Sequence, residues 1–382
     1  MSTPSRAVRR RRLLGLMAVS APALAGCVRF TPVDPDATRP TASGSAAAGS
    51  ATVSFTDSTG RQVELPREVT RVAPASPLAD IMLFPIAAEQ MVGWSSAPGS
   101  AAVGVFGSSY RDLPELGKID AAPADFAREA VLASAPQVIV DVGKWDEEYR
   151  AGLDSLQEDL GIPVILIDGA LDASGDAFRL LGQALGKTDL GEQLGAYADG
   201  IISDVQTKTA TIAQDKRLSV YYGEGKDGLS TIIAGSIHAQ VFDMVGAELI
   251  AGKDSLQEEK RGGGTVSLET VLDKNPDAIV FGPDSIGKTV AEDASWASLD
   301  AVKGKRYYTV AGEPYNWIGR PPGPNRLLGV QWLGSVLYPE TFTYDMVART
   351  KEFYSLFYRC DLTDSEAGGL LAQPRSSSSA HG

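Results

Sequence analysis

The sequence predicts an α/β protein made of two βα lobes of similar plan, with a long connecting helix between them. Three observations lead to this fold class: a sequence repeat, an alternation of strand-like and helix-like runs, and one long stretch with helical spacing and no strand signal. Residues 53–361 number roughly 310, which is more than one hydrophobic core usually accommodates, so we expect two domains.

The repeat relates two segments that lie 140 positions apart. FAREAVLASAPQVIV, residues 126–140, aligns without gaps on VSLETVLDKNPDAIV, residues 266–280, with six identities. The identities include an acidic residue early in each segment, Glu129 and Glu269, and a proline two-thirds of the way along. Each copy predicts a short helix that the proline ends, followed by a buried strand. A chance match is the weaker explanation, so the two lobes should share one plan.

Short apolar runs bounded by turn residues alternate with helical patterns in both halves of the chain. They are VTRVAPA, MVGW, QVIVDVG and PVILIDG in the first half, and RLSVYYG, DAIVFGP and RYYTVAG in the second. This alternation indicates βα units and a mostly parallel sheet in each half. Apolar residues then keep a mostly helical spacing between the halves. We therefore expect an N-terminal lobe over 53–172, one stiff connecting helix over 173–215 and a C-terminal lobe over 216–361.

Both ends of the chain have compositions that do not predict a fold. Residues 1–26 contain five arginines, a short apolar run and small residues, which is typical of a bacterial lipoprotein signal peptide ending before Cys27. Lipidation of Cys27 would anchor the protein outside the cytoplasm, with the general secretory and twin-arginine routes both open. Residues 27–52 are rich in Pro, Ser, Ala and Gly, which favours a disordered tether. The segment 362–382 should be a disordered tail.

Charge and cysteine content exclude several kinds of partner. Without residues 1–26 the chain keeps 30 basic and 48 acidic residues, a net charge of −18, which argues against nucleic acid or an anionic membrane surface as a partner. Contact with the membrane is expected through the lipid alone. Cys360 is then the one cysteine besides Cys27, so no disulfide, no cysteine metal site and no cofactor are expected.

Over about residues 53–360 the chain resembles the class III solute-binding proteins of bacterial ABC importers. The opening phrase VSFTDSTGRQVELPREVTRVA places Asp57, Gly60 and Pro66 as that family does. The resemblance implies a ligand cleft between the lobes, and a ligand of the ferric siderophore, haem, cobalamin or molybdate type. It also implies docking to an ABC permease, with its ATPase, through one acidic residue per lobe, here Glu129 and Glu269. Both residues also suit the dipole at a helix start.

Ligand contacts are expected from loops that follow the carboxyl ends of the strands. The segment 314–326, PYNWIGRPPGPNR, follows such a strand and is stiffened by four prolines. In it, Trp317 should offer a flat apolar face, Arg320 a planar fork for a carboxylate or another oxyanion, and Tyr315 a further contact. Arg326 starts an amphipathic helix and is more simply interpreted as closing the loop or pairing with an acidic residue.

A second cleft loop is expected at residues 221–240. Its GxGxxG pattern does not indicate dinucleotide binding, because the residues after it favour a strand and acidic side chains interrupt it. Tyr222, Lys226 and His238 are the expected contacts, with a structural role for His238 equally open. From the first lobe, Trp145 is expected to contact the ligand, and Ser76, Trp94 and Lys144 are weaker candidates.

These observations predict an extracytoplasmic substrate-binding lipoprotein that captures an iron-siderophore-type metal complex and delivers it to an ABC permease. A molybdate- or tungstate-like oxyanion or cobalamin is the alternative ligand. A secreted enzyme that uses carboxylates stays open, although the body has one histidine and no Gly-x-Ser-x-Gly elbow. A lipoprotein that binds another protein is a third possibility.

Overall fold

The computed structural model describes residues 52–371 apart from 100–101, 103–104, 120–127 and 261. The predicted signal peptide, Cys27, nearly all of the tether and the last eleven residues of the tail lie outside the described residues. Within the described part, no helix is both long enough and apolar enough to cross a membrane.

The N-terminal lobe contains a parallel three-stranded sheet in the order β3-β4-β5, with an antiparallel hairpin β1-β2 beside it. Strands β4 and β5 are buried over nearly their whole length, which explains their runs of Val, Ile and Leu, interrupted in β4 by Asp141. The predicted strand MVGW forms only isolated bridges at Met91 and Trp94. The strands are β1 (Thr52–Thr56), β2 (Gln62–Pro66), β3 (Val72–Pro74), β4 (Val138–Gly143) and β5 (Val164–Asp168), and the helices are α1 (Pro77–Ala87), α3 (Ser108–Arg111), α4 (Arg128–Ser134) and α5 (Glu147–Leu160).

The C-terminal lobe has a parallel four-stranded sheet in the order β12-β11-β6-β8 and a small antiparallel sheet in the order β7-β10-β9. The strands are β6 (Ser219–Gly223), β7 (Ser230–Ile232), β8 (Glu248–Leu249), β9 (Glu258–Lys260), β10 (Gly263–Thr265), β11 (Ala278–Phe281) and β12 (Tyr307–Thr309). The helices are α8 (Gln240–Met244), α9 (Leu268–Lys274) and α10 (Asp300–Lys303).

The sequence repeat corresponds to a structural repeat. In each lobe a seven-residue helix, α4 or α9, leads into the inner strand β4 or β11. Ala135 and Asn275 follow these helices with φ of 45° and 38°, so both helices end on a left-handed residue. Past the prolines, Gln137 Oε1 accepts the amide of Arg71 at 3.0 Å, and Asp277 Oδ2 accepts that of Ser219 at 2.9 Å. The predicted α/β fold with two lobes of one plan is confirmed.

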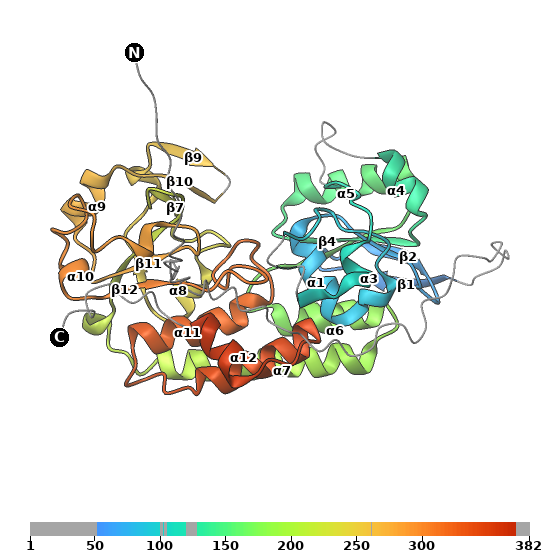
Figure 1. Ribbon diagram of the computed structural model, residues 1–382. Coiled ribbons are helices and arrows are strands. Elements are labelled where there is room, and N and C mark those ends of the chain that lie inside the picture. Colours follow the sequence, from blue (N-terminus) through green and yellow to red (C-terminus); the bar gives the residue numbers. More distant parts are fainter. Residues whose placement is uncertain (1–51, 100–101, 103–104, 120–127, 261, 372–382) are drawn as a thin grey trace, which may run out of the picture.

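The connection between the lobes is a helical hairpin, so the prediction of a single helix over 173–215 is wrong. It consists of α6 (Ser174–Ala184) and α7 (Thr188–Thr209). Gly186 adopts a left-handed φ of +68° between them, which ends the first helix. The two helices pack closely enough that a Cβ on Gly182 would lie 2.9 Å from the Cα of Gly191. In Figure 1, α7 runs beneath both lobes while α6 lies under the N-terminal lobe.

Helix α7 forms a common base with α11 (Asn325–Leu337) and α12 (Met346–Tyr358), as Figure 1 shows. One continuous hydrophobic cluster extends from the N-terminal lobe through these helices into the C-terminal lobe. The predicted disordered tail is partly wrong, because residues Asp364–Leu371 form α13, which packs on α12 and buries Ala367. The lobes therefore share a packed base.

Candidate functional site

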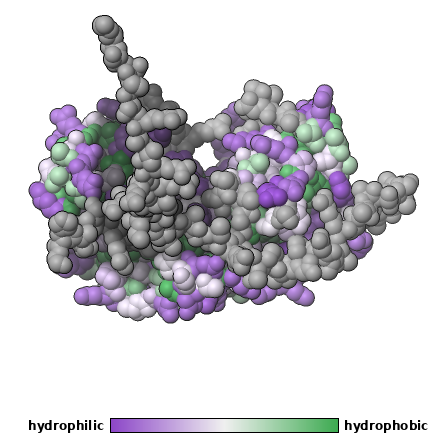
Figure 2. Space-filling model, viewed as in Figure 1, coloured by the Kyte–Doolittle hydropathy of each residue, from purple (hydrophilic) through white to green (hydrophobic). Residues whose placement is uncertain are grey.

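The candidate site is the gap between the lobes, which the space-filling view in Figure 2 shows as an opening. In each parallel sheet the carboxyl ends of the strands lie along one edge, where polar loops can gather. Cavities are present at such edges in both lobes. Lys144 follows β4 of the N-terminal lobe, and Asp243 lies on α8 of the C-terminal lobe. Burial raises the pKa of Asp243, and the positive charge of Lys144 opposes that rise, so the two side chains interact electrostatically from opposite lobes.

The cavity in the C-terminal lobe has a volume of about 370 Å³ and lies beyond the carboxyl ends of β6, β11 and β12. Gly225, Gly282 and Gly312 lie in its wall, and the hydroxyl oxygen of Ser285 is buried without a hydrogen-bond partner among the described residues. The charged groups in its wall are Glu224, Asp284 and Arg320. The cavity can therefore offer both donors and acceptors to a ligand.

A chain of polar contacts holds Arg320 in that wall. Its Nε donates to Glu224 Oε2 at 2.6 Å, and the Tyr222 hydroxyl donates to the other carboxylate oxygen at 3.2 Å. The amide of Asn316 donates to the Tyr222 hydroxyl oxygen at 3.0 Å. The Arg320 side chain is 45% exposed, whereas that of Glu224 is 14% exposed. Tyr222 is buried on β6, and burial raises its pKa well above the usual value.

Trp317 does not expose a flat apolar face, contrary to the expectation from the sequence. It is 1% exposed and belongs to the core cluster that joins the lobes. A Cβ on Gly329 of α11 would lie 1.9 Å from the carbonyl oxygen of Trp317, which shows how closely the helix packs on the loop. The expected platform for a ligand is therefore an internal anchor. Trp94, a weaker candidate, is likewise fully buried, and its indole donates to the carbonyl of Tyr110 at 2.7 Å.

Other residues of the 314–326 segment reach the first lobe. Tyr315 is half-buried, lines the cavity and has its ring centroid 5.9 Å from that of Phe106. Burial raises the pKa of Tyr315, and the nearby carboxyl group of Asp80 on α1 adds to the rise. A Cβ on Gly323 would overlap Ile81 of α1. The proline-rich segment thus lies at the junction of the lobes, next to the gap.

Arg326 has a structural role, as the sequence favoured, and it closes the loop through neutral acceptors, with no ion pair to an acidic residue among the described residues. It is 2% exposed, and its guanidinium donates to the carbonyl of Gly169 at 2.6 Å and to Gln240 Oε1 at 2.7 Å. Burial lowers its pKa to about 9, against the opposing effect of Asp172 and Asp168.

His238 and Lys226 lie outside the lining of the C-terminal cavity. His238 Nδ1 is 2.5 Å from the carbonyl oxygen of Gly319, so the ring holds the proline-rich loop, and burial lowers its pKa. Lys226 is exposed on the turn between β6 and β7, where the GxGxxG glycines form a hairpin and no helix follows. The structure brings together Arg320, Tyr315 and Tyr222, whereas His238 and Lys226 lie outside this group.

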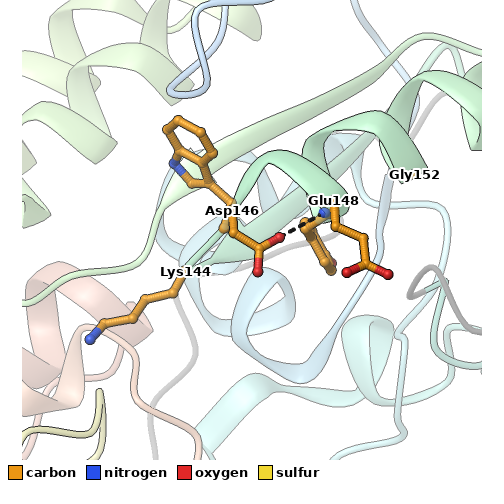
Figure 3. Close-up of a pocket in the computed structure, with 6 residues that line it drawn as sticks. Lys144, Asp146, Glu148 and Gly152 are labelled. Atoms are coloured by element: carbon orange, nitrogen blue, oxygen red, sulfur yellow. Dashed lines mark hydrogen bonds between the residues drawn. The ribbon is translucent and has the colours of Figure 1, made fainter.

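The N-terminal lobe has a cavity of about 520 Å³, shown in Figure 3. It is lined by Lys144, Trp145, Asp146, Glu148, Tyr149 and Gly152. Asp146 caps α5 by accepting the amide of Tyr149 at 2.8 Å, which fixes the loop after β4. Trp145 is 36% exposed, so its indole is open to a ligand. In Figure 3, Lys144 and Glu148 lie at opposite ends of the group of lining residues, with Asp146 between them, and the Lys144 side chain points away from Glu148.

Two residues of this site were not selected from the sequence. Glu224 directly follows β6 and Asn316 lies beside Trp317, and both hold the polar chain behind Arg320. The position of Glu224 after a predicted strand was a usable signal. Asn316 carried no pattern that sets it apart. Ser76, another weak candidate, caps α1 and contacts Asp141 at 3.3 Å.

The two repeated acidic residues are accessible. Glu129 and Glu269 are exposed in the first turns of α4 and α9, and the described residues provide no ion-pair partner for either. In Figure 1 these helices lie on the same side of the molecule, one on each lobe and away from the base. A partner that spans both lobes could contact them together.

Comparisons with known proteins agree on one family. The sequence profile described as periplasmic binding protein matches residues 88–314. An uncharacterized ABC transporter substrate-binding lipoprotein, YvrC of Bacillus subtilis, is 25% identical over 227 residues, which are 56% of this chain and 66% of that protein. The matched region is just under two thirds of that relative.

Solved structures show the same fold. An ABC transporter solute binding protein from Sulfurospirillum deleyianum superposes with a TM-score of 0.75 at 27% identity, covering 83% of this chain and 98% of the other. The molybdate-bound protein MolA of Haemophilus influenzae gives 0.66 at 22% identity, covering 81% and 99%. The vitamin B12 binding protein BtuF of Vibrio cholerae gives 0.53 at 18% identity, covering 70% and 96%.

Proposed function

The chain belongs to the periplasmic binding protein family, and on this premise we propose that it is the substrate-binding lipoprotein of an ABC importer. The family consists of binding proteins, which confirms the expectation that this chain is not an enzyme. In this proposal Cys27 carries the lipid at the outer face of the membrane. The protein captures its ligand there and passes it to the permease and its ATPase.

The observation that carries the proposal is the pair of polar cavities, one at the carboxyl edge of each sheet, above a base that both lobes share. A ligand between the lobes could contact Arg320 and Tyr315 on one side and Trp145 on the other. Because one hydrophobic cluster joins the lobes through the base, closure around a ligand should be small. The relative from Bacillus subtilis, itself called a substrate-binding lipoprotein, supports both the role and the anchor.

We propose an iron-siderophore-type metal complex as the ligand, with an oxyanion or cobalamin as alternatives. Relatives of this fold include a molybdate-bound protein and a vitamin B12 binding protein, so the fold alone does not choose. A thermal-shift screen of the mature protein with ferric chelates, haem, cobalamin, molybdate and tungstate tests the function. A ligand at a hundredfold its dissociation constant adds about 2.7 kcal/mol to the unfolding free energy. A protein whose melting temperature no member of the panel raises would contradict the proposal.

We further propose that Glu129 and Glu269 dock the protein onto basic residues of the permease. Two carboxylates in matching local structures can contact a two-fold partner, one from each lobe. The double variant E129K/E269K should therefore lose uptake while its ligand affinity stays within twofold. A matched control reverses two exposed acidic residues on other surfaces, D189K/D215K, and should keep uptake. Equal losses of ligand binding and uptake in E129K/E269K would contradict the assignment.

A further inference from the structure

We propose that the ligand carries no net negative charge, being a neutral or cationic organic metal complex, and that Glu224 is the residue that excludes oxyanions. This inference rests on the proposed function and specifies its substrate class. It is carried by the charges of the two cavities and by the ion pair that occupies Arg320.

Both cavities contain more acid than base. The wall of the C-terminal cavity has the carboxylates of Glu224 and Asp284 against one cation, Arg320, so its formal charge is −1. The N-terminal cavity has Asp146 and Glu148 against Lys144, which again gives −1. His238 adds no positive charge at pH 7, because burial lowers its pKa. An anion between the lobes would therefore meet four carboxylates and two cations.

The guanidinium of Arg320 is already paired. Its Nε donates to Glu224 Oε2 at 2.6 Å, and the carboxylate is mostly shielded from water. The hydroxyl of Tyr222 donates to the other oxygen of that carboxylate, and the side-chain amide of Asn316 donates to the Tyr222 hydroxyl, so the buried Tyr222 helps to fix the position of the charge. An oxyanion that approached Arg320 would lie next to the negative charge of Glu224, which would repel it.

A bare metal ion fits no better than an oxyanion. Across the described residues there is no group of three or more His, Cys, Asp or Glu side chains placed to hold one. Organic surface, in contrast, has partners in both walls: the exposed indole of Trp145 and the half-buried ring of Tyr315. A metal held inside an organic chelator would present such surface together with little or no negative charge.

The test compares the wild-type protein with E224Q by calorimetry and thermal shift. The panel contains molybdate, tungstate, phosphate, a neutral and a cationic ferric trihydroxamate, an anionic ferric tricatecholate and neutral cobalamin. The wild type should bind one of the neutral or cationic complexes at least a hundredfold more tightly than any anion. E224Q frees the Arg320 guanidinium and should bind the anions at least tenfold more tightly than the wild type does.

The matched control is D227N, which removes an equal charge from the exposed turn three residues away, outside the cavity. It should change anion affinity less than twofold. If E224Q does not fold, E224D keeps the charge and should keep the discrimination. Tightest binding of an oxyanion or the tricatecholate by the wild type would overturn the inference and leave the proposed function standing. Unchanged anion affinity in E224Q would overturn the role of Glu224. A protein that binds no member of the panel would overturn the proposed function, and this inference with it.

Discussion

The substitution Arg326→Met tests whether one buried guanidinium stabilises the junction of the lobes. Its Nη2 donates to the carbonyl of Gly169, at the end of the first sheet, and its Nη1 to Gln240 Oε1 on α8 of the second lobe. Weaker contacts reach the carbonyls of Ile237 at 3.3 Å and Gly323 at 3.2 Å. Among the described residues, no carboxylate lies within ion-pair distance of Arg326, so neutral acceptors supply its hydrogen bonds.

The expected magnitude follows from opposing effects. Each of the two short hydrogen bonds to a charged donor contributes about 1.5–3 kcal/mol. Methionine would also leave the buried carbonyl of Gly169 unpaired at a cost of about 1–3 kcal/mol, whereas Gln240 Oε1 would keep the amide of Leu171 at 3.0 Å. Removing the cation also removes its desolvation penalty, which is several kcal/mol for a buried ion. Because methionine keeps much of the volume, we expect R326M to lower the free energy of unfolding by about 2–4 kcal/mol.

The measurement is urea unfolding of the mature protein, followed by tryptophan fluorescence and far-UV circular dichroism. R111M is the matched control, because Arg111 is exposed and pairs with its neighbour Asp112 at the surface. The control should change the unfolding free energy by less than about 0.5 kcal/mol. A loss below that value in R326M, with an unchanged m-value, would refute the reasoning.

Two further predictions concern a buried acid and the glycines of α7. Burial raises the pKa of Asp80 from its usual 3.8 to about 7, so its contribution to stability is complete below the unfolded value and is lost as pH rises through about 7. D80N should therefore flatten the fall in melting temperature between pH 4 and 8, and an unchanged slope would argue against this cause. G191A places a Cβ 2.7 Å from the carbonyl oxygen of Phe178 and should cost about 1–3 kcal/mol, whereas Gly200 on the same helix has nothing within 4 Å and G200A should gain about 0.5–1 kcal/mol. Equal melting temperatures for the two variants would contradict the packing argument.

The lobes could be predicted from the sequence because their repeat has local physical causes. A proline two residues past a helix and a short strand rich in Val and Ile are both encoded by neighbouring residues, and both copies fold as expected. The connector could not be predicted as readily. Helices α6 and α7 both bury a face in the same core, so apolar spacing continues through the turn, and Gly186 was the one local sign that two helices are present.

The sequence indicated which loops line the cavities but not which of their side chains pair with one another. The rule that ligands lie beyond the carboxyl ends of parallel strands selected Arg320, Tyr315 and Trp145, which line cavities in the structure; their contact with a ligand stays a prediction. It did not say which charges would pair. Arg320 and Glu224 are 96 residues apart in sequence and come together only when the loops after β6 and β12 meet. A fold-level contact of this kind leaves no pattern in a single sequence.

Trp317 shows why residue type alone misassigned one member of the loop. Prolines restrict the backbone of this segment, but a loop that must present Arg320 at a fixed place also needs an attachment to the core. Trp317 provides this attachment by burying its indole. Asn316 strengthens it, because its side-chain oxygen accepts the backbone amide of Ile318 at 2.7 Å and its backbone carbonyl accepts the side-chain amide of Asn325 at 2.9 Å. Trp317 therefore keeps the loop rigid, and the guanidinium of Arg320, beside Glu224, is the group of the loop that can contact a ligand.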